Sequence, residues 1–241
     1  MAEKNYGLME KAHEGQELYK EYNGEKWGRF PVKTRLILID EDLDKVIEEF
    51  VKPELREGDI LCIASKIISI TKGFYVKESD LKVGWLANFL VRFVKKWPDD
   101  KGYAVPAKIQ LAMNIVGMPR FIFALVVGGI LKVFGQTGWF YRIAGHNING
   151  IDGFIPEQYP EPLRGYGFLI PDNTDEISTE IENKFKTMCA LTDGNNIENH
   201  VMGMGNKLKN FIKKDELLKI LAGNPQGQEG NTPFLILRKV N

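Results

Sequence analysis

The stretch "ILCIASKIISITKG", Ile60–Gly73, contains an apolar run that is interrupted by a Ser-Lys pair. Its first five residues predict a buried strand, and the residues from Ser65 onward predict a helix that stops near Gly73. Backbone N–H groups at the start of a helix lack partners and attract anions. Ser65 and Lys66 therefore indicate either a phosphate-binding turn or an ordinary helix start beside a solvated lysine.

The residues before this stretch alternate between strand and helix patterns. Asn23-Gly24 within "QELYKEYNGEKWGRF" (16–30) predicts a tight hairpin. "VKTRLILI" (32–39) predicts a strand, and "DEDLDKVIEEFV" (40–51) predicts an amphipathic helix with acidic residues in its first turn. This β-α-β-α order is typical of a layered domain in which helices cover a sheet.

The middle of the chain has a different character. Three apolar segments punctuated by prolines predict a helical insertion at about 79–135. "GWFYRIAG" (138–145) then predicts a strand, and "HNINGIDGFIPEQYPEPL" (146–163) predicts a long loop of the kind that often carries function. The apolar surface of the insertion leads us to expect a homodimer.

The remaining segments return to alternation of strands and helices. We expect strands at 165–171, 188–193, 197–203 and 233–240, and helices at 172–188 and 213–223. The predicted fold class is α+β, a mixed β-sheet core with packed helices and a helical insertion, in which the strand Ile60–Ala64 is central. Residues 1–30 form an extension with the hairpin, and residues 31–241 form one domain.

Composition limits the classes of function. Lys plus Arg and Asp plus Glu both total 32, and this zero net charge argues against nucleic acid as a partner. The N-terminus lacks the apolar centre of a signal peptide, so we expect a cytoplasmic protein. The apolar segment 121–135 is shorter than the ~20 residues of a transmembrane helix. It predicts a buried helix or, beside "VKKW" (94–97), attachment to a membrane surface.

Few residues have the pattern of catalytic or metal-binding groups. Asp152 in "NGIDG" and Asp193 in "LTDGNN" occupy glycine-adjacent turns, where an aspartate either serves function or caps its own turn. The Gly- and Gln-rich loop "NPQGQEGN" (224–231) could offer backbone N–H groups to phosphate or be a surface turn. We expect the other candidates to be structural, because the histidines lack metal-ligand spacing and the cysteines lie in apolar runs: His13, His146, His200, Cys62 and Cys189.

Five segments together resemble the GTP-dependent F420-0:γ-glutamyl ligases, which add glutamate to the deazaflavin coenzyme F420. The resemblance covers about 31–239, and its closest form is that of bacterial proteins with a ligase-like domain and a helical insertion. The segments are "GDILCIASKIIS" (58–69), "AGHNINGIDG" (144–153), "GYGFLIPDNTDEISTEI" (165–181), "ALTDGNN" (190–196) and "GQEGNTPFLILR" (227–238).

The resemblance implies a fold, two cofactors and a set of site residues. It implies an α+β fold, a dimer, GTP as the nucleotide and Mn²⁺ or Mg²⁺ as the metal. Asp152, Asp193 and Glu229 would bind the metal. The residues implied to bind the nucleotide are Thr34, Arg35, Leu36, Ile37, Ser65, Lys66, Gly227 and Gln228.

Two functions remain open at this point. The first is a GTP- and metal-dependent amide ligase that joins an amino acid such as L-glutamate to a small carboxylate, with coenzyme F420-0 as the candidate, through an acyl phosphate. The second is a non-catalytic or regulatory nucleotide-binding protein that keeps the ligase fold. Ile70 and Ile155 favour the second, because the resembled ligases carry nucleotide-contacting lysine and asparagine at those positions. We expect nucleotide and small-molecule partners, no nucleic acid and no transmembrane segment.

Overall fold

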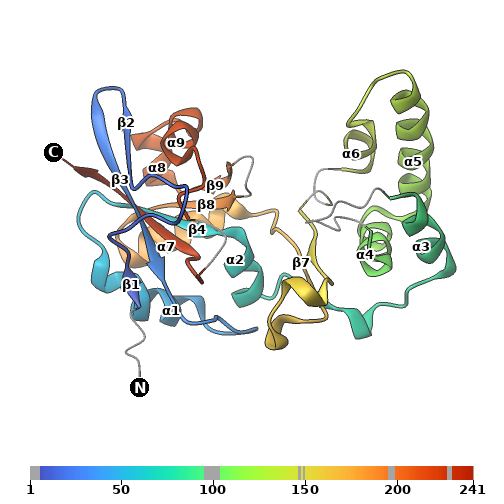
Figure 1. Cartoon of the computed structure of the whole chain (residues 1–241), viewed down its shortest axis with the longest axis horizontal. Helices are drawn as coiled ribbons and strands as arrows, with labels where there is room; N and C mark the ends of the chain where they lie inside the picture. Colours follow the sequence, from blue (N-terminus) through green and yellow to red (C-terminus); the bar gives the residue numbers. More distant parts are fainter. Residues whose placement is uncertain are drawn as a thin grey trace. The chain divides into compact units, whose positions relative to one another are not determined.

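The structure is a computed structural model that describes residues 6–94, 104–145, 148, 150–194, 199–226 and 230–240. The chain forms two compact units (Figure 1). The first unit comprises 1–73 and 171–241, and the second comprises 74–170, so that the second unit is inserted into the first.

The first unit is built on a mixed sheet. Its strands are β1 (Gly7–Leu8), β2 (Tyr19–Tyr22), β3 (Glu25–Lys33), β4 (Ile60–Ala64), β8 (Met188–Gly194), β9 (Asn199–Met204) and β10 (Phe234–Val240). The order is β1-β3-β10-β4-β8-β9, with β2 paired to β3. Only the β4–β8 pair is parallel among the described strands, and β4 lies between β10 and β8 as predicted for a central strand.

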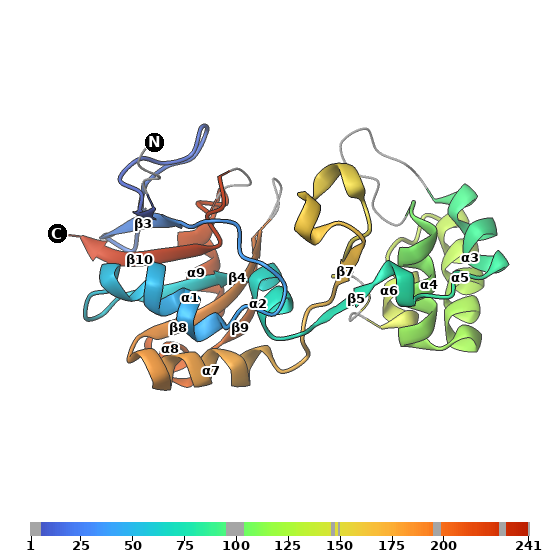
Figure 2. The ribbon, with the colours of Figure 1, turned by 90° about the horizontal axis from the view of Figure 1, so that it is seen from below.

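Helices cover both faces of this sheet (Figure 2). They are α1 (Leu43–Phe50), α2 (Ser65–Thr71), α7 (Thr174–Phe185), α8 (Asn206–Phe211) and α9 (Lys214–Leu221). Ile60 and Cys62 of β4 join a core cluster with α8 and α9, and the alternate residues Leu61 and Ile63 on the opposite face are also fully buried. The predicted α+β architecture is confirmed.

Several local predictions for the first unit are confirmed by particular contacts. Asn23 and Gly24 have positive φ angles of 51° and 75°, as a two-residue hairpin turn requires. Helix α1 starts after Asp42, whose side chain accepts a hydrogen bond from Asp44 N, and its predicted apolar face is buried. Both cysteines are buried, unpaired and part of the core, and burial raises the pKa of Cys62 to about 12.

The predicted strand at 32–39 is largely wrong. Strand β3 ends at Lys33, because the second arm of the hairpin already forms this strand from Glu25 onward. Beyond it, the backbone N–H of Thr34 donates to the carbonyl oxygen of Asn231 at 2.9 Å, in the segment before β10. The chain therefore leaves the sheet at Thr34. Helix α8 is an element that the pattern did not predict.

The second unit is mainly helical, as the insertion was expected to be. It contains α3 (Trp85–Leu90), α4 (Pro106–Val116), α5 (Met118–Val133) and α6 (Trp139–Ala144), with a small sheet of β5 (Tyr75–Lys77), β7 (Tyr166–Phe168) and β6 (Asp152–Gly153). Short 3-10 turns occur at Lys52–Glu54, Glu78–Asp80, Val91–Phe93, Pro156–Gln158 and Glu161–Leu163.

The strand predicted at 138–145 is wrong, because these residues form α6. Phe140 of α6 packs edge-on against Phe121 of α5, with ring centroids 5.4 Å apart. A side chain at Gly128 would lie only 3.0 Å from the backbone nitrogen of Phe140, so glycine permits the close approach of α6 to α5. Packing between helices thus overrides the strand preference of the aromatic run.

Within the described residues, no single helix has the length and hydropathy of a membrane span. Helices α4 and α5 meet that test only when taken together, and the chain bends by 111° at the break between them.

Candidate functional site

One end of the first unit's sheet carries three of the predicted nucleotide residues, Thr34, Ser65 and Lys66. The carboxyl ends of β3, β4 and β8 lie at this end, and antiparallel β10 begins there, since Phe234 pairs with both Val32 and Ile63. The parallel register aligns Ala64 with Thr192, which places the residues after each of them side by side. Ligand sites in open α/β sheets form outside such carboxyl ends. We call this region the sheet-end site.

Ser65 and Asp193 contact each other at the sheet-end site. The hydroxyl of Ser65 donates to Oδ1 of Asp193 at 3.0 Å, although the residues are 128 positions apart. Ser65 is buried at the start of α2, whereas Asp193 is exposed. Lys66, the next residue, is exposed. The structure therefore joins two predicted site residues through a bond that orients a solvent-facing carboxylate.

The loop that precedes β10 is fixed to the same end of the sheet by a network of buried polar groups. The hydroxyl of Thr192 donates to Oε1 of Gln226 at 2.9 Å, and Nε2 of Gln226 donates to the carbonyl oxygen of Pro233 at 3.0 Å. Thr232 Oγ1 donates to the carbonyl oxygen of Gln226 at 2.6 Å, which closes the loop. Ala64 N donates to the carbonyl oxygen of Pro233 at 2.9 Å. The loop ends are thus held against β4 and β8.

The predicted residues Gly227, Gln228 and Glu229 lie between these anchors, outside the described residues. Their role stays a prediction. The anchors Thr192, Gln226 and Thr232 were not predicted from the sequence, because a buried glutamine or threonine has no signature apart from its tertiary partners.

The four residues of the predicted segment 34–37 differ in their surroundings. Thr34 is buried and bonded to Asn231 of the anchored loop. Arg35 instead makes a paired contact with Glu41, at 2.8 and 2.7 Å, and this contact raises the pKa of Arg35. Leu36 is half-buried, and Ile37 is buried in the core. Of these four side chains, only Thr34 is bonded to the loop of the sheet-end site by a described contact.

Asp152, a second predicted metal ligand, belongs to the second unit. It pairs with Phe168 in the small sheet, and its Oδ1 accepts a hydrogen bond from Gly153 N at 2.7 Å. The same oxygen lies 4.0 Å from Nζ of Lys108, a lysine with only 5% of its side chain exposed. Lys108 was not selected from the sequence, because it is far from Asp152 along the chain and belongs to no motif. The joint role of Asp152 and Asp193 stays a prediction.

Glycine is required beside Asp152. Gly153 has a φ of +94°, and a Cβ atom at this position would lie 2.1 Å from the carbonyl oxygen of Tyr166. The glycine therefore lets β6 approach β7 and holds the backbone that carries Asp152.

The remaining polar candidates that the structure describes belong to no group of metal ligands. Across the described residues, no three His, Cys, Asp or Glu side chains group together as metal ligands would. His13 Nε2 lies 3.1 Å from the hydroxyl of Thr232, and His200 pairs with Asp193 in the β8–β9 register. His146 lies outside the described residues. Oxygen donors at Asp193 and Ser65 are nevertheless of the type that Mg²⁺ and Mn²⁺ prefer.

Comparison with known proteins assigns the family. A curated relative, the uncharacterized protein MJ1361 of Methanocaldococcus jannaschii, is 26% identical over 139 residues, which cover 56% of this chain and 47% of the relative. The chain thus spans about half the length of that relative. The sequence model of the family described as F420-0:Gamma-glutamyl ligase matches residues 31–193, which include β4, the Ser65–Lys66 pair and both aspartates. The chain belongs to the F420-0:gamma-glutamyl ligase family.

Proposed function

We propose that the protein is a ligase that joins the amine of an amino acid such as L-glutamate to the carboxylate of a small substrate. Coenzyme F420-0 is the substrate that the family description indicates, GTP is the proposed nucleotide, and Mn²⁺ or Mg²⁺ is the proposed metal. The observation that carries the proposal is the hydrogen bond between Ser65 and Asp193, which joins two residues of the family's motifs at the carboxyl edge of parallel strands.

The proposed reaction requires a site that binds and positions phosphate groups. A carboxylate does not react with an amine in water unless it is first activated. In the proposed reaction, the γ-phosphoryl group of GTP passes to a carboxylate oxygen, which gives an acyl phosphate and GDP. The amine nitrogen then attacks the acyl carbon, phosphate leaves and an amide bond forms. Phosphoryl transfer depends mainly on positioning and on positive charge near the phosphates.

Lys66 is the residue of the sheet-end site best suited to supply fixed positive charge. It is exposed beside Ser65, at the junction of β4 and α2, where a triphosphate could reach its ammonium group. An ammonium group gives charge-assisted hydrogen bonds to phosphate oxygens. The bond from Ser65 orients Asp193 without neutralising its carboxylate.

The donor set of Asp193 suits a hard divalent cation. The resemblance adds Asp152 and Glu229 as further ligands, and a bound ion would neutralise negative charge on the triphosphate. Asp152 also has the geometry of a turn cap, since its own oxygen accepts from Gly153 N. The Lys108 ammonium lies 4.0 Å from the same oxygen.

The anchored loop supports the nucleotide part of the proposal. Gln226 and Thr232 are buried and hold the two ends of the segment that contains Gly227 and Gln228. A glycine-rich segment fixed at both ends can present backbone N–H groups to phosphate without a large ordering cost. The buried polar anchors beside β4 and β8 are the observation that supports this role.

The test is phosphate release from GTP with Mn²⁺ and F420-0, measured with and without L-glutamate. We expect release to depend on glutamate. Lys66→Ala should weaken GTP binding by about tenfold to a hundredfold in isothermal titration, because a charge-assisted contact contributes ~1.5–3 kcal/mol. Lys45→Ala, on an exposed position of α1, is the matched control. Equal GTP affinity in Lys66→Ala and the parent would make Lys66 a surface charge.

The second candidate function is a nucleotide-binding protein without ligase activity. Ile70 and Ile155 favour it, because both side chains are only 2% exposed and thus belong to the packed interior. Neither side chain could take over a polar contact with nucleotide. GTP binding that is accompanied by no glutamate-dependent phosphate release would support this candidate and contradict the ligase.

A further inference from the structure

Helix α5 is apolar around most of its circumference, yet the second unit covers only part of it. Phe121 and Ala124 are buried in the core of that unit. The other side of the helix leaves large apolar residues exposed, namely Phe123 (60%), Val126 (53%), Ile130 (54%) and Val133 (84%). A helix that is hydrophobic all round is normally buried on every side, in a protein core or in lipid.

The exposed residues lie on one face of the helix. Their spacing of three and four places them one above another along α5. Gly128 is on the inner side, where α6 approaches closely, whereas a Cβ atom at Gly129 would meet no atom within 4 Å. The helix thus has an inner face that packs within the unit and a separate outer apolar face.

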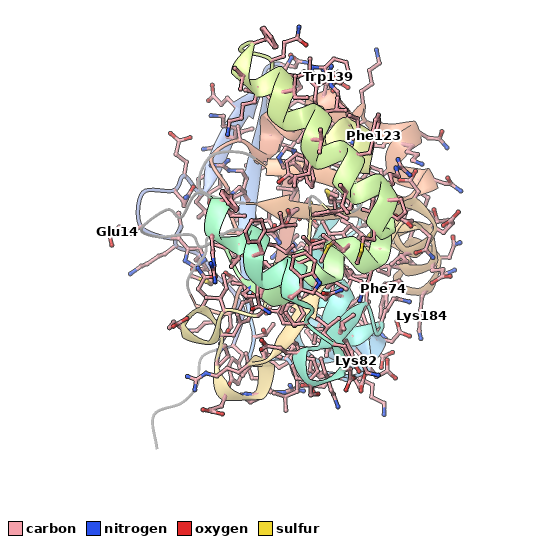
Figure 3. All side chains as sticks on the ribbon, turned by 90° about the vertical axis from the view of Figure 1, so that its right-hand side faces the viewer. Glu14, Phe74, Lys82, Phe123, Trp139 and Lys184 are labelled. Atoms are coloured by element: carbon pink, nitrogen blue, oxygen red, sulfur yellow. The ribbon has the colours of Figure 1, made fainter. Side chains whose placement is uncertain are left out.

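A second apolar stripe belongs to the segment of α3 and the turn that follows it. Trp85 (79% exposed), Phe89 (46%) and Phe93 (73%) are spaced four residues apart, and the rings of Phe89 and Phe93 lie 5.2 Å apart. Helices α3 and α5 lie on the same side of the second unit, which faces the viewer in Figure 3, where Phe123 is labelled. We call the exposed apolar residues of α3 and α5 the insertion face.

The charge of this part of the chain differs from that of the whole. Between residues 81 and 151 the sequence has nine Lys and Arg but two Asp and Glu, and no acidic residue occurs from 101 to 151. The complete chain has 32 of each, so the rest of it carries an acidic excess. Such asymmetry within one chain is typical of an interaction with an anionic surface. Exposed members of the basic set are Lys82, Arg92, Lys132 and Arg142.

We propose that the insertion face docks on the surface of an anionic lipid bilayer. Apolar side chains of α5 and α3 would enter the acyl boundary, and the exposed lysines and arginines would remain at the level of the anionic headgroups. Trp85, which is 79% exposed, supplies an amphipathic ring of the kind that favours this depth. The basic residues complement the anionic headgroups, and the exposed apolar side chains match the acyl chains. These two properties together favour a lipid surface as the binding partner.

The geometry indicates surface attachment. Helix α5 has 16 residues, fewer than the ~20 that cross a bilayer, and the 111° bend prevents α4 from continuing it in a straight line. Since α5 is too short to cross, its exposed apolar face would instead rest along the interface, beside the basic residues of the insertion. A second copy of the chain is a less suitable occupant, because a twofold interface would place this basic face against itself.

Vesicle flotation tests the proposal with the full chain. Vesicles of phosphatidylcholine alone are compared with equal mixtures of phosphatidylcholine and phosphatidylglycerol. We expect binding to the anionic vesicles that weakens with added salt, and weaker binding to the neutral ones. The double variant Phe123→Glu, Val133→Glu should lower partitioning onto anionic vesicles by at least about tenfold. The double variant Lys132→Gln, Arg142→Gln should lower it by about thirtyfold, because each basic residue near the surface contributes ~1 kcal/mol.

Phe211→Glu is the matched control, because Phe211 is an exposed aromatic residue of the first unit (47%). It should bind vesicles as the parent does, and circular dichroism should show that all variants fold. Failure of the parent to float with anionic vesicles, or equal binding by the Phe123→Glu, Val133→Glu variant, would overturn the proposal. A dimer in light scattering that this variant abolishes, without vesicle binding by the parent, would assign the face to a second copy.

Discussion

The two units of the chain differ in how many large apolar side chains they leave exposed to solvent. In the first unit, the central strands are buried on both faces, and four large apolar side chains among the described residues are exposed. In the described part of the second unit twelve are exposed, all between Trp85 and Phe134. A sheet covered by helices on both faces can bury its apolar residues within one chain, whereas a small group of helices leaves an outer face.

Polar groups show the opposite distribution. In the first unit, one group of polar residues meets at the sheet-end site, where Ser65 bonds to Asp193 and the loop anchors bond to one another. In the second unit, the exposed charged residues between 81 and 145 that the structure describes are all basic. Most of the proposed phosphate-binding residues thus belong to the first unit, and the proposed lipid contact belongs to the second.

The largest expected effect is at Asp193. Asp193→Asn keeps the shape of the side chain and removes its charge, so it should lower Mn²⁺-dependent GTP binding and phosphate release by about a hundredfold or more. Titration of GTP in the presence and absence of Mn²⁺ measures this loss. Asp172→Asn, at an exposed position of the same unit, is the control. Normal metal-dependent binding by Asp193→Asn would leave Asp193 as a residue of β8 that only accepts the hydrogen bond from Ser65.

Combining Asp193→Asn with Asp152→Asn tests whether the second unit also contributes a ligand to the metal. We expect Asp152→Asn to reduce Mn²⁺-dependent binding strongly and the double variant to lose little more, because two ligands of one ion are not additive. A double-mutant cycle of GTP affinities measures the coupling. Additive losses would mean that the second unit contributes no ligand to the ion at Asp193.

Gly153→Ala should destabilise the second unit by about 2–4 kcal/mol. The new Cβ would overlap the carbonyl oxygen of Tyr166 at a φ of +94°, where side chains are strained. Differential scanning calorimetry measures the effect and also tests the comparison. A shift confined to one of two transitions indicates that the units unfold separately, whereas an unchanged melting curve would contradict the close approach of β6 to β7.

Glu41→Gln should lower the free energy of unfolding of the first unit by about 1 kcal/mol at neutral pH. The hydrogen bond from Arg35 lowers the pKa of Glu41 in the folded state. The stabilisation is therefore complete above the unfolded pKa of roughly 4.3 and is lost as the pH falls through the lower folded value. Urea unfolding at neutral and acidic pH should show the parent and the variant converging in acid. A difference that is independent of pH would exclude this ion pair as its source.

The smallest effect is expected at Gly129 on the insertion face. Gly129→Ala should stabilise the second unit by about 0.5–1 kcal/mol, because alanine loses less backbone entropy in a helix and its Cβ would meet nothing. Thermal unfolding measures the shift, and vesicle binding should be unchanged. Gly128→Ala is the contrasting variant and should destabilise, since α6 lies against that position.

The sequence determined the elements that depend on local pattern. The apolar face of α1, the turn at Asn23-Gly24, the strand of β4 with Ser65 after it, and the helical character of the insertion are all encoded within short windows. Hydrophobic periodicity and turn preferences depend on neighbouring residues. These elements can therefore be predicted without knowing how the remainder of the chain packs. The family motifs were readable for the same reason.

Only the tertiary structure determined which residues far apart in the sequence come into contact. The aromatic run 139–144 forms helix α6, because Gly128 of α5 leaves room for the backbone of α6. Strand β3 ends at Lys33, because Thr34 bonds to the segment before β10. The tertiary structure also joined Ser65 to Asp193 and buried Gln226 between Thr192 and Pro233. These contacts link residues far apart in the chain, and their energies depend on burial and register, which no local window contains.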